Sequence, residues 1–324
     1  MGMPRLLLFC ALAVIALVPA SPAAAKSSIR VGVADQSPAM FDSPHFKQLK
    51  IRRTRYFVPS DVMQDRAERA KARAFVIAAR RNRVSTLLHI STTDLRSKRG
   101  RVVSTAKYRR DVGRMVAYFR KLGVRDFGAW NEVNHKTQET WNRVGNAVSY
   151  YKSMYSAVKR RCRTCNVVGL DILDQAGSDR YIRSFYARLS RTWRTRLKVV
   201  GIHNYSDVNR SRSTGTAKII NTVRRYNKRT KFWFTETGAL ASFGRSFKYN
   251  EARQASRMRN MFTYANRYRS RGVERVYSYN FFGIEDAAYG CGTRCRFDAG
   301  LVDPDGTPRP VFAVFRSKLA SYSR

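Results

Sequence analysis

The chain has 324 residues, of which 63 are Lys or Arg and 22 are Asp or Glu, so its formal net charge is +41 at pH 7. The basic residues are spread over the whole sequence without a recognition motif, which argues against a specific nucleic-acid-binding protein. A field of this sign attracts anionic polymers or an acidic cell surface. The same composition also fits a solvated basic surface that has no partner.

The first 25 residues have the pattern of a secretory signal peptide. Arg5 precedes an apolar run from Leu6 to Val18, and an Ala-x-Ala sequence ends at Ala25. The apolar run is too short to span a bilayer comfortably, and no later segment approaches that length. We therefore expect cleavage after Ala25 and a monomeric protein, secreted or associated with the cell envelope, that comprises residues 26–324.

Strand-like and helix-like segments alternate along the rest of the chain. Strands are predicted over 29–34, 51–58, 84–91, 124–131, 166–173, 197–205, 231–235 and 273–282. Helices are predicted over 65–82, 105–122, 145–161, 178–193, 216–228, 251–271 and 310–320. Eight such units predict an α/β fold, a single-domain (β/α)8 TIM barrel. An open doubly wound sheet is the alternative, but no Gly-rich phosphate loop follows any strand.

Two of these strands lead to a glutamate. The fourth strand leads to Glu132, and the seventh leads to Glu236, which Thr237 and Gly238 follow. The C-terminal ends of barrel strands form the face on which active sites are built. Two carboxylates facing each other across that face are what cleavage of a glycosidic bond requires.

Side-chain alternation suggests how the neighbouring residues are used. In the seventh strand it places Phe232, Phe234 and Glu236 on one face, which we interpret as the interior of the barrel. In the sixth strand it places His203 and Tyr205 on a common face. The Tyr205 hydroxyl would then donate to Glu236 and keep that carboxylate ionised.

The fourth strand supplies two further expectations. The amide of Asn131 is suited to bind a sugar hydroxyl beside the reacting centre. Glu132 would first protonate the leaving oxygen and then activate water, which calls for a pKa above that of Glu236. The two carboxyl groups should lie roughly 5 to 5.5 Å apart, the separation of retaining enzymes.

These residues together resemble the retaining TIM-barrel glycoside hydrolases of clan A. The resemblance implies that Glu132, in Trp-Asn-Glu, is the acid/base and that Glu236, in Thr-Glu-Thr-Gly, is the nucleophile. His203 and Tyr205 match the His-x-Tyr arrangement of the sixth strand, and Arg55 resembles the second-strand Arg that hydrogen-bonds the nucleophile. A glycoside or polysaccharide substrate is implied. A non-catalytic barrel that binds polysaccharide or cell wall is the alternative.

The eighth strand departs from this pattern. Such enzymes often present a Trp beneath the reacting sugar, and the nearest aromatic here is Phe281 or Phe282, of which we take Phe281 as the substrate contact. Trp141, just after the fourth strand, is a better sugar-platform candidate than Trp193. The histidines are scattered without the spacing of a ligand set, so we expect no metal and no cofactor. Which sugar is cleaved stays open, although a basic cleft would favour anionic glycans.

Four cysteines remain after removal of the signal segment, namely Cys162, Cys165, Cys291 and Cys295. An even number in an exported protein predicts disulfides, and three pairings are possible. The short-range pairing would join Cys162 to Cys165 and Cys291 to Cys295. A four-thiolate zinc site is the rival interpretation, because both pairs have roughly the spacing of zinc ligands.

Overall fold

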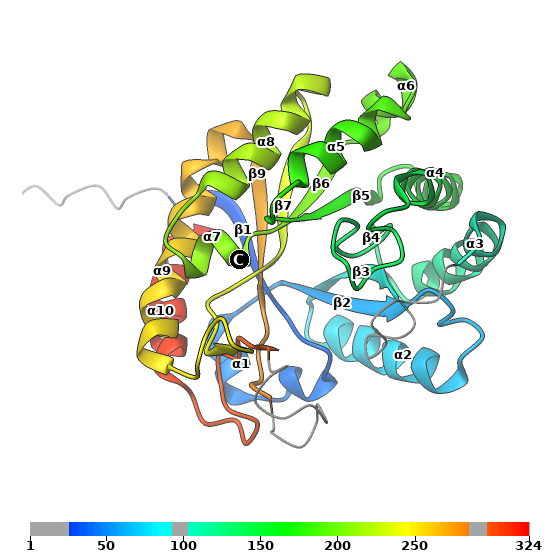
Figure 1. The fold of residues 1–324 in the computed structure, drawn as a ribbon. Coiled ribbons are helices and arrows are strands. Elements are labelled where there is room, and N and C mark those ends of the chain that lie inside the picture. Colours follow the sequence, from blue (N-terminus) through cyan, green and yellow to red (C-terminus); the bar gives the residue numbers. More distant parts are fainter. Residues whose placement is uncertain (1–25, 93–102, 285–296, 324) are drawn as a thin grey trace, which may run out of the picture.

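The computed structural model describes residues 26–92, 103–284 and 297–323, and Figure 1 shows its ribbon. The main sheet contains nine parallel strands in the order β11-β1-β9-β7-β6-β5-β4-β3-β2. Its strands are β1 (Ser27–Ala34), β2 (Arg53–Pro59), β3 (Ser85–Ser91), β4 (Asp126–Gly128), β5 (Asn166–Leu173), β6 (Val199–His203), β7 (Lys231–Thr237), β9 (Val273–Tyr279) and β11 (Tyr322–Ser323). All of them except β11 form a nearly closed barrel, which confirms the predicted (β/α)8 fold.

Helices surround the barrel and connect successive strands (Figure 1). They are η1 (Pro38–Phe41), α1 (Pro44–Leu49), α2 (Arg66–Arg81), α3 (Thr105–Lys121), α4 (Val144–Arg161), α5 (Ser178–Ala187), α6 (Arg191–Arg196), α7 (Tyr205–Asn209), α8 (Thr214–Tyr226), α9 (Glu251–Arg267), η2 (Arg269–Arg271) and α10 (Pro310–Leu319). Two short strands, β8 (Ser242–Phe243) and β10 (Phe297–Asp298), pair antiparallel outside the barrel. The predicted signal peptide lies outside the described residues.

Several element boundaries differ from the prediction. The fourth strand is only three residues long, because the chain turns after Gly128 to present the residues that follow. The predicted helix over 178–193 is divided into α5 and α6, since the Ser190 hydroxyl accepts the amide of Trp193 and starts a new helix. The sixth strand ends at His203, and α7 begins two residues later.

The barrel strands have two buried faces. Their inner side chains form a central layer of Leu87, Val168, Val199, Trp233 and Tyr277. Their outer side chains join the larger core against the helices, as where Tyr56 of β2 packs on Phe75 of α2 with ring centroids 4.4 Å apart. The packed interior closes the barrel beneath the C-terminal ends of the strands, where a site can be open to solvent.

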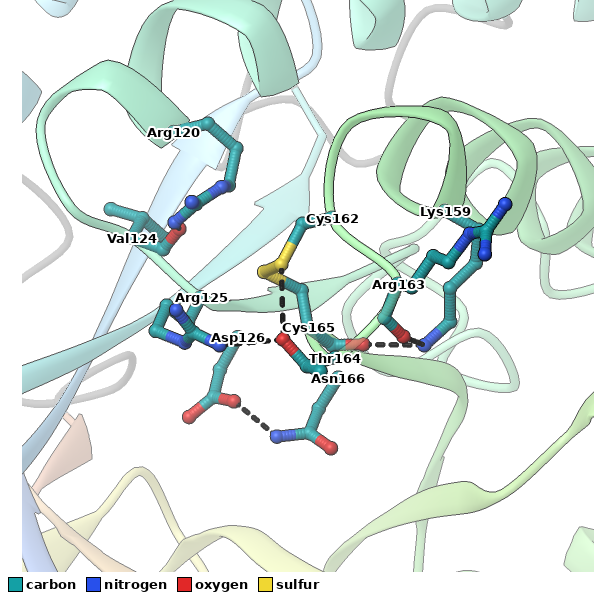
Figure 2. The surroundings of a disulfide bond; sticks show 10 residues. All are labelled: Arg120, Val124, Arg125, Asp126, Lys159, Cys162, Arg163, Thr164, Cys165 and Asn166. Atoms are coloured by element: carbon teal, nitrogen blue, oxygen red, sulfur yellow. Dashed lines mark hydrogen bonds between the residues drawn. A yellow bond between two sulfur atoms is a disulfide. The ribbon is translucent and has the colours of Figure 1, made fainter.

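One disulfide joins the C-terminal end of α4 to the start of β5 (Figure 2). Cys162 and Cys165 form this bond, as the short-range pairing predicts, and the two sulfurs are therefore not available as zinc thiolates. Lys159 donates to the Cys165 carbonyl at 2.6 Å and so fixes the same turn. The bond lies where a helix leads into a strand, at the opposite end of the barrel from the strand C-termini. Cys291 and Cys295 lie outside the described residues.

Within the part of the chain that the structure describes, no helix combines the length and the apolar character needed to cross a membrane.

Candidate active site

The two predicted catalytic glutamates lie close together at the C-terminal end of the barrel. Three atoms, namely one carboxylate oxygen of Glu132, one of Glu236 and one ring nitrogen of His203, all lie within 4.8 Å of one another. The side chains of Glu132 and Glu236 keep 18% and 11% of their surface exposed, so a solute can reach both. The arrangement fits the short carboxylate separation that the sequence predicts and that double displacement uses.

Glu132 is held in an unusual backbone conformation. It follows β4 in a turn and has a backbone φ of +42°, a left-handed value that residues other than Gly rarely adopt. Such a conformation costs on the order of 1 kcal/mol or more and persists where surrounding contacts impose it. Here its amide donates to Asp171 Oδ2 at 3.3 Å, and the next amide, from Val133, donates to the Asp171 carbonyl at 3.0 Å. The turn aims the carboxylate over the barrel.

Glu236 receives a donor on each oxygen. Arg55 Nη1 donates to Oε2 at 2.7 Å, and the Tyr205 hydroxyl donates to Oε1 at 3.0 Å. The guanidinium of Arg55 is fully buried, and its Nη2 donates to Asn131 Oδ1 at 2.5 Å. A buried cation and two directed donors fix the orientation of the Glu236 carboxylate. The structure thus brings four predicted residues, Arg55, Asn131, Tyr205 and Glu236, into direct contact.

The side-chain alternation along β7, which places Glu236 inside the barrel, differs from the prediction. Trp233 belongs to the central layer of the barrel, whereas Phe232 and Phe234 belong to the outer core, so the predicted parity of the strand is wrong. Between Trp233 and Glu236, β7 advances three residues while β6 advances two, from Gly201 to His203. This extra residue is a β-bulge, which turns Glu236 to the inside.

His203 connects Glu132 to a second buried acid. Its Nδ1 lies 3.0 Å from Glu132 Oε1, and its Nε2 lies 2.9 Å from Asp171 Oδ2. Asp171 also accepts the Thr235 hydroxyl at 2.5 Å. Gly201 permits this approach, because a Cβ there would stand 1.8 Å from Asp171 Oδ1. The sequence reading missed Asp171, although a lone acid inside the apolar run 166–173 was a signal that could have found it.

The carboxylates around His203 determine the protonation state of its imidazole. Burial lowers the pKa of His203, but the charges of Asp171 and Glu236 and close contacts to Asp171 and Glu132 raise it to about 10. Burial likewise works against ionised Asp171, yet the charge of His203 and its close contact hold the pKa of Asp171 well below the usual range. His203 is therefore an imidazolium at neutral pH, held between two carboxylates.

The expected high pKa of Glu132 is not what the site produces. Burial raises the pKa of Glu132, but the hydrogen bond and the charge of His203 outweigh it and lower the pKa below its ordinary value. The prediction failed because it treated Glu132 without its neighbour. In a pair this close, one proton belongs to both groups, and it lies on the imidazole in the free protein.

His89 is a further buried neighbour that the sequence reading did not assign. Burial lowers its pKa to about 3, so it is neutral. Arg55 Nε points to its Nδ1 at 3.4 Å. The ring occupies space left by Gly128, where a Cβ would lie 2.1 Å from a His89 ring carbon. His89 therefore supports the guanidinium that holds Glu236 and takes no part as a charge.

The predicted sugar contact of Phe281 is wrong. The side chain has no exposed surface and packs in the main core, with its ring centroid 5.8 Å from that of Phe46. Partly exposed aromatic residues lie nearby instead. Tyr279 of β9 lies 6.4 Å from Phe57 of β2 and 6.1 Å from Phe297, measured between ring centroids. These three rings are better placed to contact a sugar than Phe281.

Glu132, His203 and Glu236 form a group of the kind that can hold a cation, the one such group among the described residues. The surrounding charges argue against this use. A divalent ion there would face the buried guanidinium of Arg55, 2.7 Å from Glu236, and the imidazolium of His203. The site already contains the positive charge that its carboxylates require, so the absence of a metal stays our prediction.

No family model and no curated protein matches this sequence. Solved structures match its fold. A glucosidase from Croceicoccus marinus has a TM-score of 0.67 at 14% identity, over 91% of this chain and 67% of that one. A GH39 enzyme from Xanthomonas axonopodis pv. citri has a TM-score of 0.65 at 13% identity, over 93% and 68%. A GH10 endoxylanase from a sugarcane soil metagenome has 0.60 at 13%, over 90% and 96%.

The fold is therefore the one that these glycoside hydrolases share. At such low identity the likeness concerns the arrangement of strands and helices, and it confirms the expected resemblance at that level. The particular residues of the pocket come from this chain itself.

Proposed function

We propose that the protein is a retaining glycosidase in which Glu236 is the nucleophile and Glu132 the acid/base. The single observation that supports this most is the pair of carboxylates within 4.8 Å, one of them oriented by Arg55 and Tyr205 and the other paired with an imidazolium. When two carboxyl groups lie in distinct environments, one can act as the nucleophile and the other as the general acid.

In the first step Glu236 attacks the anomeric carbon, the bond from that carbon to the leaving oxygen breaks, and the leaving oxygen takes a proton from Glu132. Glu132 is ionised in the free protein, so it receives this proton from His203 Nδ1, 3.0 Å away, along their hydrogen bond as it passes it to the leaving oxygen. His203 is then neutral and Glu132 is again a carboxylate.

In the second step water attacks the anomeric carbon and displaces Glu236 from it. Glu132 accepts the proton of that water and shares it with His203, which restores the starting state. Asn131, whose amide oxygen is held by Arg55, keeps its amide nitrogen for a sugar hydroxyl beside the reacting carbon.

The test is a screen of the purified protein on aryl glycosides and polysaccharides with two variants. We expect Glu236→Ala to abolish turnover. Glu132→Ala should keep activity on an aryl glycoside whose leaving group needs no proton, and added azide should accelerate it, because azide replaces the water that Glu132 no longer activates. We also expect the released sugar to have the same anomeric configuration as the substrate. Tight glycan binding by the parent without turnover on any substrate would instead favour the non-catalytic barrel.

We also propose that the protein acts outside the cytoplasm, since residues 1–25 have the pattern of a cleavable signal. Mass spectrometry of the protein recovered from the medium and the envelope fraction tests this. The expected N-terminus is Lys26, and retention of the full chain in the cytoplasm would contradict the proposal.

A further inference from the structure

A groove lies between the loop that follows β4, which also carries Glu132, and the first half of α5. Its volume is about 520 Å³, which is within the range of small-ligand sites. Asn134, two residues beyond Glu132, lines one end of it, and Trp141 lines another part of the same loop. The loop that carries Glu132 therefore also supplies two of the residues that line the groove.

Trp141 is the most informative residue of the groove. It is 47% exposed, which is unusual for so large an aromatic side chain in this protein. An indole ring left open to water at the edge of a groove offers a flat apolar face, against which the C–H face of a sugar can lie.

Arg180 gives the groove its charge. Its side chain is exposed and lines the cavity, and it forms no ion pair with any residue in the described ranges. Its neighbour Asp179 is already paired with Arg183 at 2.6 Å. No carboxylate lines the groove, so the guanidinium is available for an anion, to which it can donate two parallel hydrogen bonds.

Hydrogen bonds join the two segments that carry Trp141 and Arg180. The hydroxyl of Tyr181, next to Arg180 on α5, donates at 2.9 Å to the carbonyl of Thr140, next to Trp141. The Thr140 hydroxyl in turn donates to the Val133 carbonyl at 2.9 Å. The backbone positions of Trp141 and Arg180 are thus fixed relative to each other, which lowers the entropic cost of binding a ligand between them.

We infer that this groove is a subsite for an acidic sugar, a hexuronic acid residue on the leaving-group side of the cleaved bond. Its ring lies against Trp141 and its carboxylate pairs with Arg180. This assignment rests on the proposed function for the position of the cleaved bond, and it narrows the substrate to anionic glycans. The overall charge of +41 favours the same class of ligand.

The test measures binding by calorimetry in the inactive Glu236→Gln background, at about 150 mM salt so that long-range attraction is screened. The probes are tetragalacturonic acid and its fully methyl-esterified form, in which each carboxylate is replaced by an uncharged methyl ester. We expect the acid form to bind about tenfold more tightly than the ester, as a charge-assisted hydrogen bond on an exposed side chain allows. Arg180→Gln should remove that difference, and Trp141→Ala should weaken both probes by about tenfold.

Arg183→Gln is the matched control, because it removes a cation from the same helix outside the groove. An acid preference that survives Arg180→Gln, or that Arg183→Gln removes equally, would overturn the inference. Failure of the proposed function has a separate signature. Acid binding that depends on Arg180 and Trp141, combined with no turnover of any glycoside by the parent protein, would retain the subsite and reject the hydrolase.

Discussion

Replacement of Asp171 by Asn tests the proton-sharing arrangement directly. Asp171 Oδ2 lies 2.9 Å from His203 Nε2, and the surrounding carboxylates raise the pKa of His203 from 6.5 to about 10. That difference corresponds to roughly 5 kcal/mol in favour of the protonated imidazole, and Asp171 is its largest favourable source. Asn keeps the shape of the side chain and removes the charge.

Without that charge, the burial of His203 is opposed by fewer carboxylates, so the pKa of its imidazole falls. Loss of about half of this stabilisation lowers kcat/KM by roughly 10²-fold at pH values above the lowered pKa. The pH profile gives the more specific result. Activity requires the shared proton, so it is present below the pKa of the pair and is lost as pH rises through it. In the parent this loss occurs at alkaline pH, and in Asp171→Asn it moves to lower pH by two units or more.

The assay is kcat/KM on an aryl glycoside between pH 5 and pH 10.5, with circular dichroism to confirm the fold. Asp174→Asn is the control, because Asp174 is another buried acid directly after the same strand that binds amides of α7 rather than His203. The reasoning is refuted if the alkaline limb of Asp171→Asn coincides with that of the parent while the protein remains folded. A similar displacement in Asp174→Asn would also refute it.

Three further outcomes are expected. Tyr205→Phe removes one of the two donors to Glu236 and should lower kcat by about tenfold to a hundredfold with the thermal midpoint nearly unchanged, as steady-state kinetics and calorimetry can check. Gly201→Ala places a methyl group within 1.8 Å of Asp171 Oδ1, so denaturant titration should show a loss of about 1–3 kcal/mol together with impaired turnover, and full activity would contradict the described packing. Replacing both cysteines of the α4–β5 disulfide by Ala should reduce stability by about 2 kcal/mol, the value for so short a loop, and leave kcat/KM unaltered.

Much of the fold followed from local patterns. The alternation of strands and helices predicted the barrel, and position at strand ends predicted that Glu132 and Glu236 would meet. Arg55 and Tyr205, proposed from the resemblance, do contact Glu236. These expectations depended only on the order of elements and on the edge at which parallel strands end.

What could not be predicted depends on contacts between strands. The bulge in β7 exists only relative to the register of β6 and β9, so alternation within one strand assigned the wrong face to Phe234. The low pKa of Glu132 arises from His203, which is 71 residues away in sequence. Phe281 was predicted to contact the substrate from its position in the sequence, whereas its side chain is fully buried in the core.

The barrel has a seam between β1 and β2. The two strands are the neighbours that the hydrogen-bonded order of the described strands leaves unjoined, and β11 pairs with β1 in place of β2. Local opening starts where backbone bonds are fewest, so amide exchange should be fastest along this line. Because β2 carries Arg55, which donates to Glu236, separation at the seam removes this contact while the rest of the molecule is intact. On heating, the proposed activity should therefore be lost at a temperature below the midpoint of global unfolding.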